Sequence, residues 1–268
     1  MKRNYYLLAG LTLTGVLAAV TLLGFFWTPY DSAAMSAEKF LPPSAAHLFG
    51  TDNFGRDIFS RVMEGAGTSF VIALSTIAIG AGGGILLGAV TGYFGGLADE
   101  LLIRVGDVLT AFPSILLALT VISLLGPGKP FNLVLSLGLV FIPSFARVTR
   151  AAYAEAREVN YVKSARLMGA SHARVMLAHI LPNTMPVLLS ALTIGFNNAV
   201  LAEASMSYLG IGVTPPDASL GYMLSEAQSV FGRAPWYALS TGGVMILFLF
   251  GVGLIGEGLR FREGDAAL

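Results

Sequence analysis

The chain has 268 residues, of which 55% are apolar and 12% charged, and its mean hydropathy is +0.73. So little polar surface excludes an ordinary soluble domain and predicts an all-α integral membrane protein. The formal net charge is zero and Cys is absent, which excludes disulfides and thiolate metal sites. The many glycines among long Leu, Ile, Val and Ala runs favour closely packed helices over an outer-membrane barrel.

The first 27 residues are expected to form an N-terminal transmembrane helix. The apolar run over residues 5–27 supplies about the 20 residues that a spanning helix requires. A cleaved signal peptide is the alternative, because small residues follow at Ala33 and beyond. The length of the run favours the membrane helix, and Lys2 and Arg3 should hold the N-terminus inside.

Residues 28–67 are polar and should form an extracytoplasmic loop. Within it, residues 47–61 combine turn formers with charged side chains. They predict a turn followed by a helix start, with Asp57 or Ser60 as cap and Arg56 paired with a carboxylate. The alternative is a metal site, whose geometry nothing in the sequence fixes, on three side chains: His47, Asp52 and Asp57.

Residues 68–260 should form the transmembrane core. Gly84, Gly88 and Gly92 repeat at a spacing of four, which lets a neighbouring helix approach one face closely. Pro113 permits a kink in the span that contains it. With the N-terminal helix, about six spans result, the later ones at about residues 69–94, 101–125, 131–145, 187–208 and 238–259.

The interval 151–183 carries dense, mostly positive charge between apolar spans. Its composition predicts two short helices with a turn at 168–171 and a stop at Pro182, lying between spans four and five. A basic interval of this kind is typical of a cytoplasmic loop. With both termini and the 261–268 tail inside, eleven of the sixteen Lys and Arg residues lie inside, and five outside: Lys39, Arg56, Arg61, Lys129 and Arg233.

The fifth span is the most polar. A carboxylate within a span should face protein or water, so Glu203 is either a functional residue or an interface carboxylate that bonds a neighbouring backbone. Asn197 and Asn198 are the other candidates for a substrate pathway. The outer segment 210–236 then begins with a turn, and apolar residues from Leu220 onward recur at helical spacing, which predicts an amphipathic helix.

Motifs of catalytic chemistry are absent: the sequence has no P-loop, HExxH or GxSxG pattern. His172 and His179 are expected on a helix face rather than as metal ligands. These observations favour a transporter or channel subunit over an enzyme, with no metal site and no nucleic-acid partner. Active transport would need ion coupling within the chain or an ATPase docked on the 151–183 loop, and the loop favours the ATPase.

Several stretches resemble one family in order and spacing. The run YVKSARLMGAS at 161–171, continuing to HILPN at 179–183, looks like the EAA loop of ABC importer permeases of the dipeptide, oligopeptide and nickel group. Agreement extends to LFGTD at 48–52, GYFGG at 92–96 and EAS at 203–205. The chain resembles the second permease of such systems. It departs from the family at Lys163, where an acidic residue is usual.

This resemblance implies a multi-pass permease of a bacterial or archaeal cytoplasmic membrane. Its implied partners are a homologous permease, two ABC ATPases that bind ATP and Mg²⁺, and an extracytoplasmic binding protein; no cofactor is implied for this chain. The substrate would be a peptide or a nickel or metal chelate, and the alternative is an ion-coupled carrier or channel using Glu203. The implied ATPase-coupling residues are Tyr161, Lys163, Ser164, Ala165, Leu167, Met168, Gly169 and Ala170.

Overall fold

The computed structural model describes residues 5–266, so Lys2, Arg3 and the end of the expected tail lie outside the described residues. Five of its helices are long and apolar enough to cross a membrane, or six if one bent pair forms a single span, and the all-α membrane fold is confirmed. The helices are α1 (Tyr5–Gly24), α2 (Ile58–Phe94), α3 (Gly96–Ala111), α4 (Ser114–Leu125), α5 (Pro130–Ala156), α6 (Asn160–Leu167), α7 (His172–Arg174), the π-helical η1 (Val175–Ile180), α8 (Leu181–Tyr208), α9 (Leu220–Ser229) and α10 (Pro235–Ala266).

Helix α2 is the longest element and begins at Ile58, well before the expected start near residue 69. The Asp57 side chain caps it by accepting a hydrogen bond from the Ser60 backbone N–H at 2.7 Å. This cap satisfies a donor that the first turn leaves unpaired. The predicted cap is thus confirmed, and the helix extends into the segment expected to be loop.

The third span is broken rather than kinked. Helices α3 and α4 meet at 94°, because Phe112 has an extended backbone and Pro113, with a ψ of 126°, is not helical either. Proline lacks an N–H and pushes the residue before it away from helical geometry. The span expected over residues 101–125 thus consists of two helices, and the bend expected at Pro113 is sharper than a kink.

The expected stop at Pro182 is also wrong, because α7, η1 and α8 form one continuous helical run from His172 to Tyr208. A proline ring clashes with the carbonyl four residues earlier in a regular α-helix. The π-helical turn widens the backbone just before Pro182, where the Leu181 N–H bonds the Met176 carbonyl. This turn lets the fifth span begin inside the loop.

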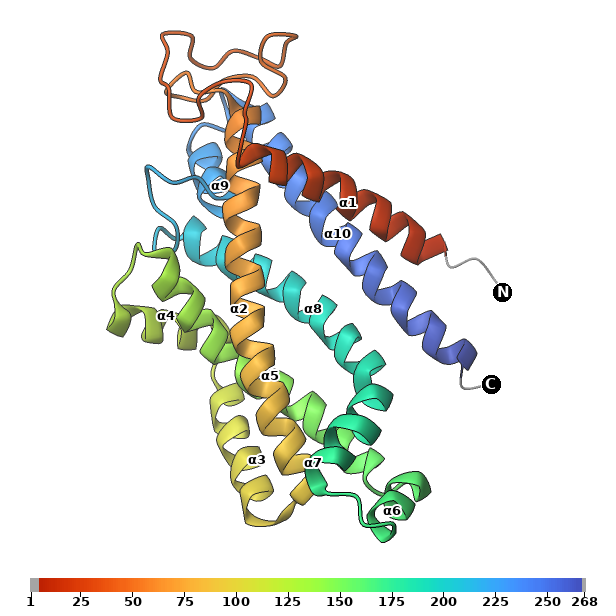
Figure 1. Ribbon diagram of the computed structural model, residues 1–268. Coiled ribbons are helices and arrows are strands. Elements are labelled where there is room, and N and C mark those ends of the chain that lie inside the picture. The colour runs from red at the N-terminus through yellow and green to blue at the C-terminus, as the bar shows by residue number, and fades with distance from the viewer. Residues whose placement is uncertain (1–4, 267–268) are drawn as a thin grey trace.

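Helices α2 and α5 pack along most of their length, and α1 lies beside α10 (Figure 1). A Cβ added at Gly84 would lie 2.4 Å from the Cβ of Phe145. One added at Gly88 would lie 2.4 Å from the Ala146 carbonyl oxygen. The glycine face therefore serves close helix packing, as its spacing predicts.

We expect Gly88→Leu to destabilise the protein, because the new side chain would have to displace the α5 backbone. Overpacking of this kind costs about 1–3 kcal/mol. Gly82→Leu is the matched control, since nothing lies within 4 Å of a Cβ at that position of the same helix. Thermal unfolding in detergent should show a lower Tm for Gly88→Leu only, and equal Tm values for the two variants would contradict the packing argument.

Candidate functional site

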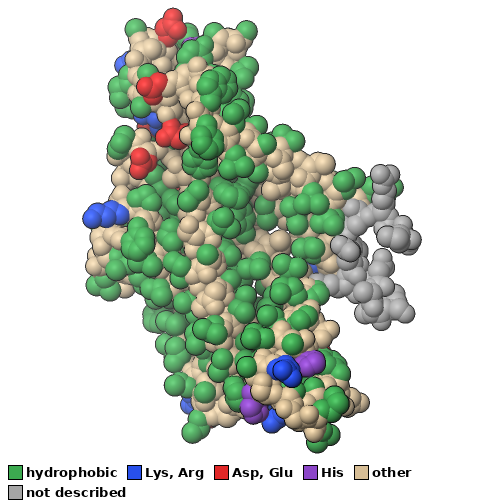
Figure 2. All heavy atoms as spheres, in the orientation of Figure 1, with side chains coloured by type: hydrophobic (Ala, Val, Ile, Leu, Met, Phe, Trp, Pro, Cys, Tyr) green, Lys and Arg blue, Asp and Glu red, His purple; other side chains and the backbone are tan. Residues whose placement is uncertain are grey.

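The end of the bundle that carries α6 presents Lys, Arg and His side chains, whereas acidic side chains gather at the opposite end (Figure 2). Helix α6 ends in a tight turn at Gly169, whose φ is +84°. The Gly169 N–H bonds the Arg166 carbonyl at 3.0 Å, and the Ala170 N–H bonds the Ala165 carbonyl at 3.1 Å. This pair of bonds is the Schellman motif, which favours glycine at its left-handed residue.

Helix α6 and the Schellman turn expose some side chains to solvent and bury others in the loop. Leu167 and Met168 are 90% and 81% exposed, so two large apolar side chains stand at the tip of the loop. Tyr161, Ser164 and Gly169 are exposed as well, and Ala170 is half-buried. Ala165 instead is only 4% exposed and packs with Val162 toward the loop interior. It supports the helix from within and offers no surface to a docking partner.

Lys163 has a carboxylate neighbour within its own loop. Its Nζ lies 3.2 Å from Glu158 Oε2, and Arg157 Nε lies 3.2 Å from the other oxygen of the same carboxylate. The hydrogen bond from Lys163 lowers the pKa of Glu158 below its usual value. The cation at position 163 is therefore locally compensated, although both side chains remain in contact with solvent.

The 151–183 loop is fastened to the C-terminal end of α2. The Tyr93 hydroxyl and His172 Nδ1 are 2.9 Å apart. Arg157 Nη1 donates to the Gly92 carbonyl at 3.2 Å. Sequence reasoning placed His172 on a helix face and gave Tyr93 no role; the GYFGG stretch was the signal that could have pointed to it. These bonds tie the loop to the longest helix.

A cavity of about 180 Å³ opens between α5 and α8. Asn198 lines it, together with the Ser144 hydroxyl. Sequence reasoning missed the α5 side of this cavity, because none of its side chains is charged. The lining residues are Phe141, Ser144, Phe145, Val148, Ala191, Ile194, Gly195 and Asn198.

The other two polar candidates of α8 lie elsewhere. Asn197 donates to the Leu249 carbonyl of α10 at 3.0 Å, so it joins two helices. Glu203 is fully buried and accepts a hydrogen bond from the Ser207 hydroxyl at 2.7 Å. The same hydroxyl accepts from the Val213 N–H at 3.0 Å, which attaches the outer segment to α8. The structure does not bring Asn197, Asn198 and Glu203 into one site.

Buried charged side chains hold the segment before α2 against the N-terminal end of α2 and against α9. Arg56 Nε donates to Asp52 Oδ2 at 2.6 Å and its Nη2 to Glu226 Oε1 at 2.8 Å, while Arg61 Nη2 donates to Glu226 Oε2 at 3.0 Å. Burial alone lowers the pKa of Arg56, but the carboxylates of Asp52 and Glu226 outweigh it and raise the pKa above its ordinary value. The predicted pairing of Arg56 is confirmed.

The metal alternative fails on geometry. His47 Nδ1 lies 2.8 Å from Asp57 Oδ1, whereas Asp52 is engaged by Arg56. Within residues 5–260, whose side chains are described, no three His, Cys, Asp or Glu side chains are arranged to hold an ion. Asp57 instead bonds Ser60 of α2, and Asp52 holds Arg56, which reaches Glu226 of α9, so these side chains attach the 28–57 segment to α2 and α9.

Residues 84–262 match the family of binding-protein-dependent transport system inner membrane components. The chain belongs to this family, so it is a multi-pass permease subunit of an ABC importer in the inner membrane. The ion-coupled carrier or channel considered above is not supported.

Among relatives, the chain is 36% identical to the dipeptide transport system permease protein DppC of Haemophilus influenzae, over 97% of this chain and 90% of that protein. It is 36% identical to the di/tripeptide transport system permease protein DppC of Pseudomonas aeruginosa, over 94% and 86%. The fold resembles an inward-facing structure of the MetNI methionine ABC transporter, with a TM-score of 0.56, 19% identity, and coverage of 75% of this chain and 91% of that one.

We expect Glu226→Gln to lower the unfolding free energy by about 3 kcal/mol, because it removes the nearest carboxylate of buried Arg61 and one of the two carboxylates that Arg56 binds. Glu100→Gln is the control: it removes an equal charge from an exposed ion pair with Arg104 and should change the free energy by less than about 1 kcal/mol. Thermal unfolding in detergent measures both. Equal effects of the two substitutions would show that the outer charge cluster does not hold the loop.

Proposed function

We propose that this permease takes up peptides that an extracytoplasmic binding protein delivers, and that α6 receives the movement of a partner ATPase. The observation that carries the proposal is the exposed pair Leu167 and Met168, fixed at the loop tip by the Schellman turn. Two adjacent large apolar side chains exposed on a basic loop are suited to a groove in a protein partner.

The proposed assembly contains a second, homologous permease and two ABC ATPases, which would bind ATP and Mg²⁺ in place of any cofactor in this chain. Orientation follows from charge, since basic residues favour the cytoplasmic side. The 151–183 loop and both termini would lie inside, and the outer loop and α9 would face the binding protein. The close approach of Gly258 of α10 to Leu7 of α1 supports termini on one side.

The proposed route of coupling follows the covalent chain. A push on α6 reaches α7 through the turn at Gly169, and α7 continues into η1 and α8 as one helical run. Tyr93 bonds His172 at the start of this run, and Arg157 bonds Gly92 beside it, so these contacts at the end of α2 would be the pivot about which α8 moves relative to α2 and α5. This movement would change the cavity that Asn198 lines, where the passing substrate would lie between the two permeases.

The peptide assignment is supported by the relatives, which are permease proteins of dipeptide and di/tripeptide transport systems. The alternative substrate is a nickel or metal chelate. Uptake by the complete transporter in proteoliposomes, with a labelled dipeptide in one arm and nickel in the other, separates them. Accumulation of nickel without peptide uptake would overturn the peptide assignment.

We expect Gly169→Val to lower ATP-driven uptake about tenfold, because a β-branched residue costs roughly 1–2 kcal/mol at a positive φ. Gly96→Val is the matched control, since Gly96 also has a positive φ, +72°, and open space around its Cβ, but lies outside the 151–183 loop. Uptake is measured with the complete transporter. The proposal loses its basis if both variants transport equally well.

Asn198→Leu should lower peptide uptake and leave the Tm unchanged, because Asn198 lines the α5–α8 cavity. Asn197→Leu should instead destabilise the protein, because it loses the hydrogen bond to Leu249. We expect its unfolding free energy to fall by about 1 kcal/mol. Paired uptake and thermal unfolding measurements test the division of roles. A normal rate for Asn198→Leu would remove that side chain from the pathway.

A further inference from the structure

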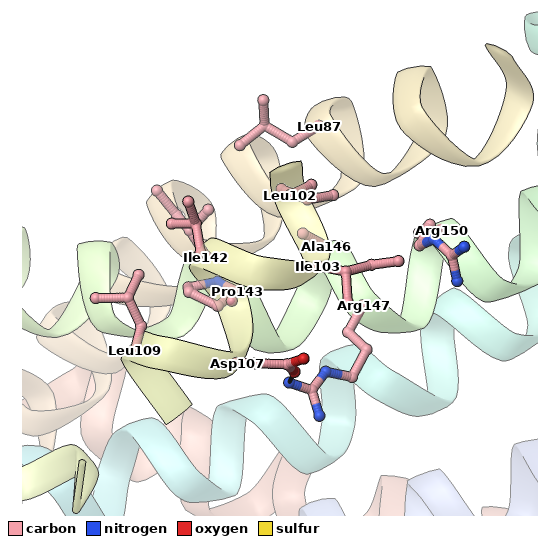
Figure 3. A pocket seen from close by; sticks show the side chains of 12 residues that line it. Leu87, Leu102, Ile103, Asp107, Leu109, Ile142, Pro143, Ala146, Arg147 and Arg150 are labelled. Carbon is pink, nitrogen blue, oxygen red and sulfur yellow. Dashed lines mark hydrogen bonds and ion pairs between the residues drawn. The ribbon is translucent and has the colours of Figure 1, made fainter. Parts of the chain in front are cut away.

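A second cavity, of about 340 Å³, lies between α2, α3 and α5 at the end of the bundle that carries the 151–183 loop (Figures 1 and 3). Its walls are mostly apolar, and Leu87, Leu109 and Ile142 are among its lining side chains. Asp107, Arg147 and Arg150 also line it. The volume falls within the range of small-molecule sites, about 300–1,000 Å³.

The two arginines differ in how completely they are engaged. Arg150 binds both oxygens of Asp99, at 2.5 and 2.7 Å. Arg147 uses only Nη2, which donates to Asp107 at 2.9 Å and to the Thr110 hydroxyl at 3.1 Å. The side chains of Arg147 and Asp107 remain 59% and 63% exposed. In Figure 3 they meet across the space between α3 and α5, so a cation and an anion are presented side by side.

Helix geometry places this cavity on the far side of α5 from the α5–α8 cavity. At 100° per residue, Ile142, Ala146 and Arg150 point away from the side occupied by Phe141 and Val148. The space is thus directed away from the route proposed for the substrate and toward the flank of the bundle. In a membrane protein, lipid covers such a flank.

We propose that this cavity binds the headgroup and upper acyl region of an inner-leaflet phosphatidylethanolamine. The phosphate would accept hydrogen bonds from Arg147, and the ammonium group would lie against Asp107. Pockets with basic groups between helices at the cytoplasmic interface are suited to phospholipid headgroups. The adjacent carboxylate makes the pair complementary to a zwitterion, whereas it opposes a purely anionic headgroup such as that of phosphatidylglycerol.

Gly106 is a position at which a larger side chain would block the cavity. It lines the cavity, and a Cβ added there meets nothing within 4 Å. Leucine at this position favours the helix and fills the cavity without an initial clash. Gly106→Leu should therefore exclude the lipid while the fold is retained.

Native mass spectrometry of the full chain, released from nanodiscs with equal amounts of phosphatidylethanolamine and phosphatidylglycerol, tests the proposal. We expect the first lipid to be retained about tenfold more than the second, and the Asp107→Asn, Arg147→Gln double variant to lose this preference. Gly106→Leu should lose the bound lipid. Two controls should behave as the unaltered chain: Arg104→Gln, which breaks an exposed pair on the same helix, and Gly82→Leu, which adds the same side chain away from the cavity.

Three outcomes would overturn the proposal. Equal retention of both lipids would contradict the role of Asp107. Displacement of the lipid by a dipeptide would place the substrate here instead. Cross-linking of a second copy through a cysteine introduced at Leu109 would mean that protein, not lipid, covers the cavity. None of these outcomes depends on whether α6 couples to an ATPase.

Discussion

The close contact between α2 and α5 is the constraint on which the rest of the structure depends. Its glycines bring the two backbones so near that no side chain fits between them. With little hydrophobic driving force between helices in lipid, such packing is a main source of association. Each end of helix α2 holds a neighbouring segment. Arg61 near its start bonds Glu226 of α9, and Gly92 and Tyr93 near its end bond the 151–183 loop.

Helix α8 continues the helical run that starts at His172, and it packs against the α2–α5 pair. The helical run begins inside the 151–183 loop, accommodates Pro182 after a π-helical turn, and continues through Pro186. Under the proposed coupling, a movement that reaches α7 through the turn at Gly169 would pass into a membrane span along continuous helix. Asn197 bonds the Leu249 carbonyl of α10, while Asn198, its neighbour in sequence, lines the α5–α8 cavity.

Local chemistry was readable from the sequence where a residue type has few alternatives. The Asp57 cap, the Arg56 pairing, the glycine face and the turn at Gly169 follow from short-range physical rules, and they are found as expected. A kink at Pro113 was expected but not its sharpness, and the passage of the helix through Pro182 was not predicted. A proline bends, breaks or is tolerated according to the turn around it, and neither the 94° angle nor the π-helical turn has a composition signal.

The positions of side chains relative to distant parts of the chain were harder to predict from the sequence. Asn197, Asn198 and Glu203 are close in sequence, yet helical rotation and packing direct them to α10, to a cavity and to the outer segment. Ala165 was grouped with the docking residues, although the helix turns it inward. The Tyr93 and His172 bond joins residues far apart in the chain, so spacing alone could not suggest it.

The central claim is that the tip of α6 is where a partner ATPase acts, and site-specific cross-linking tests it most directly. Because the chain contains no Cys, Leu167→Cys introduces a single thiol at the exposed tip, and Phe26→Cys introduces one at an equally exposed position just after α1. In the assembled, transport-competent complex, Leu167→Cys should form a cross-link to the ATPase whose yield changes when ATP is added, and Phe26→Cys should form none. A functional complex in which Leu167→Cys reaches no ATPase would contradict the account.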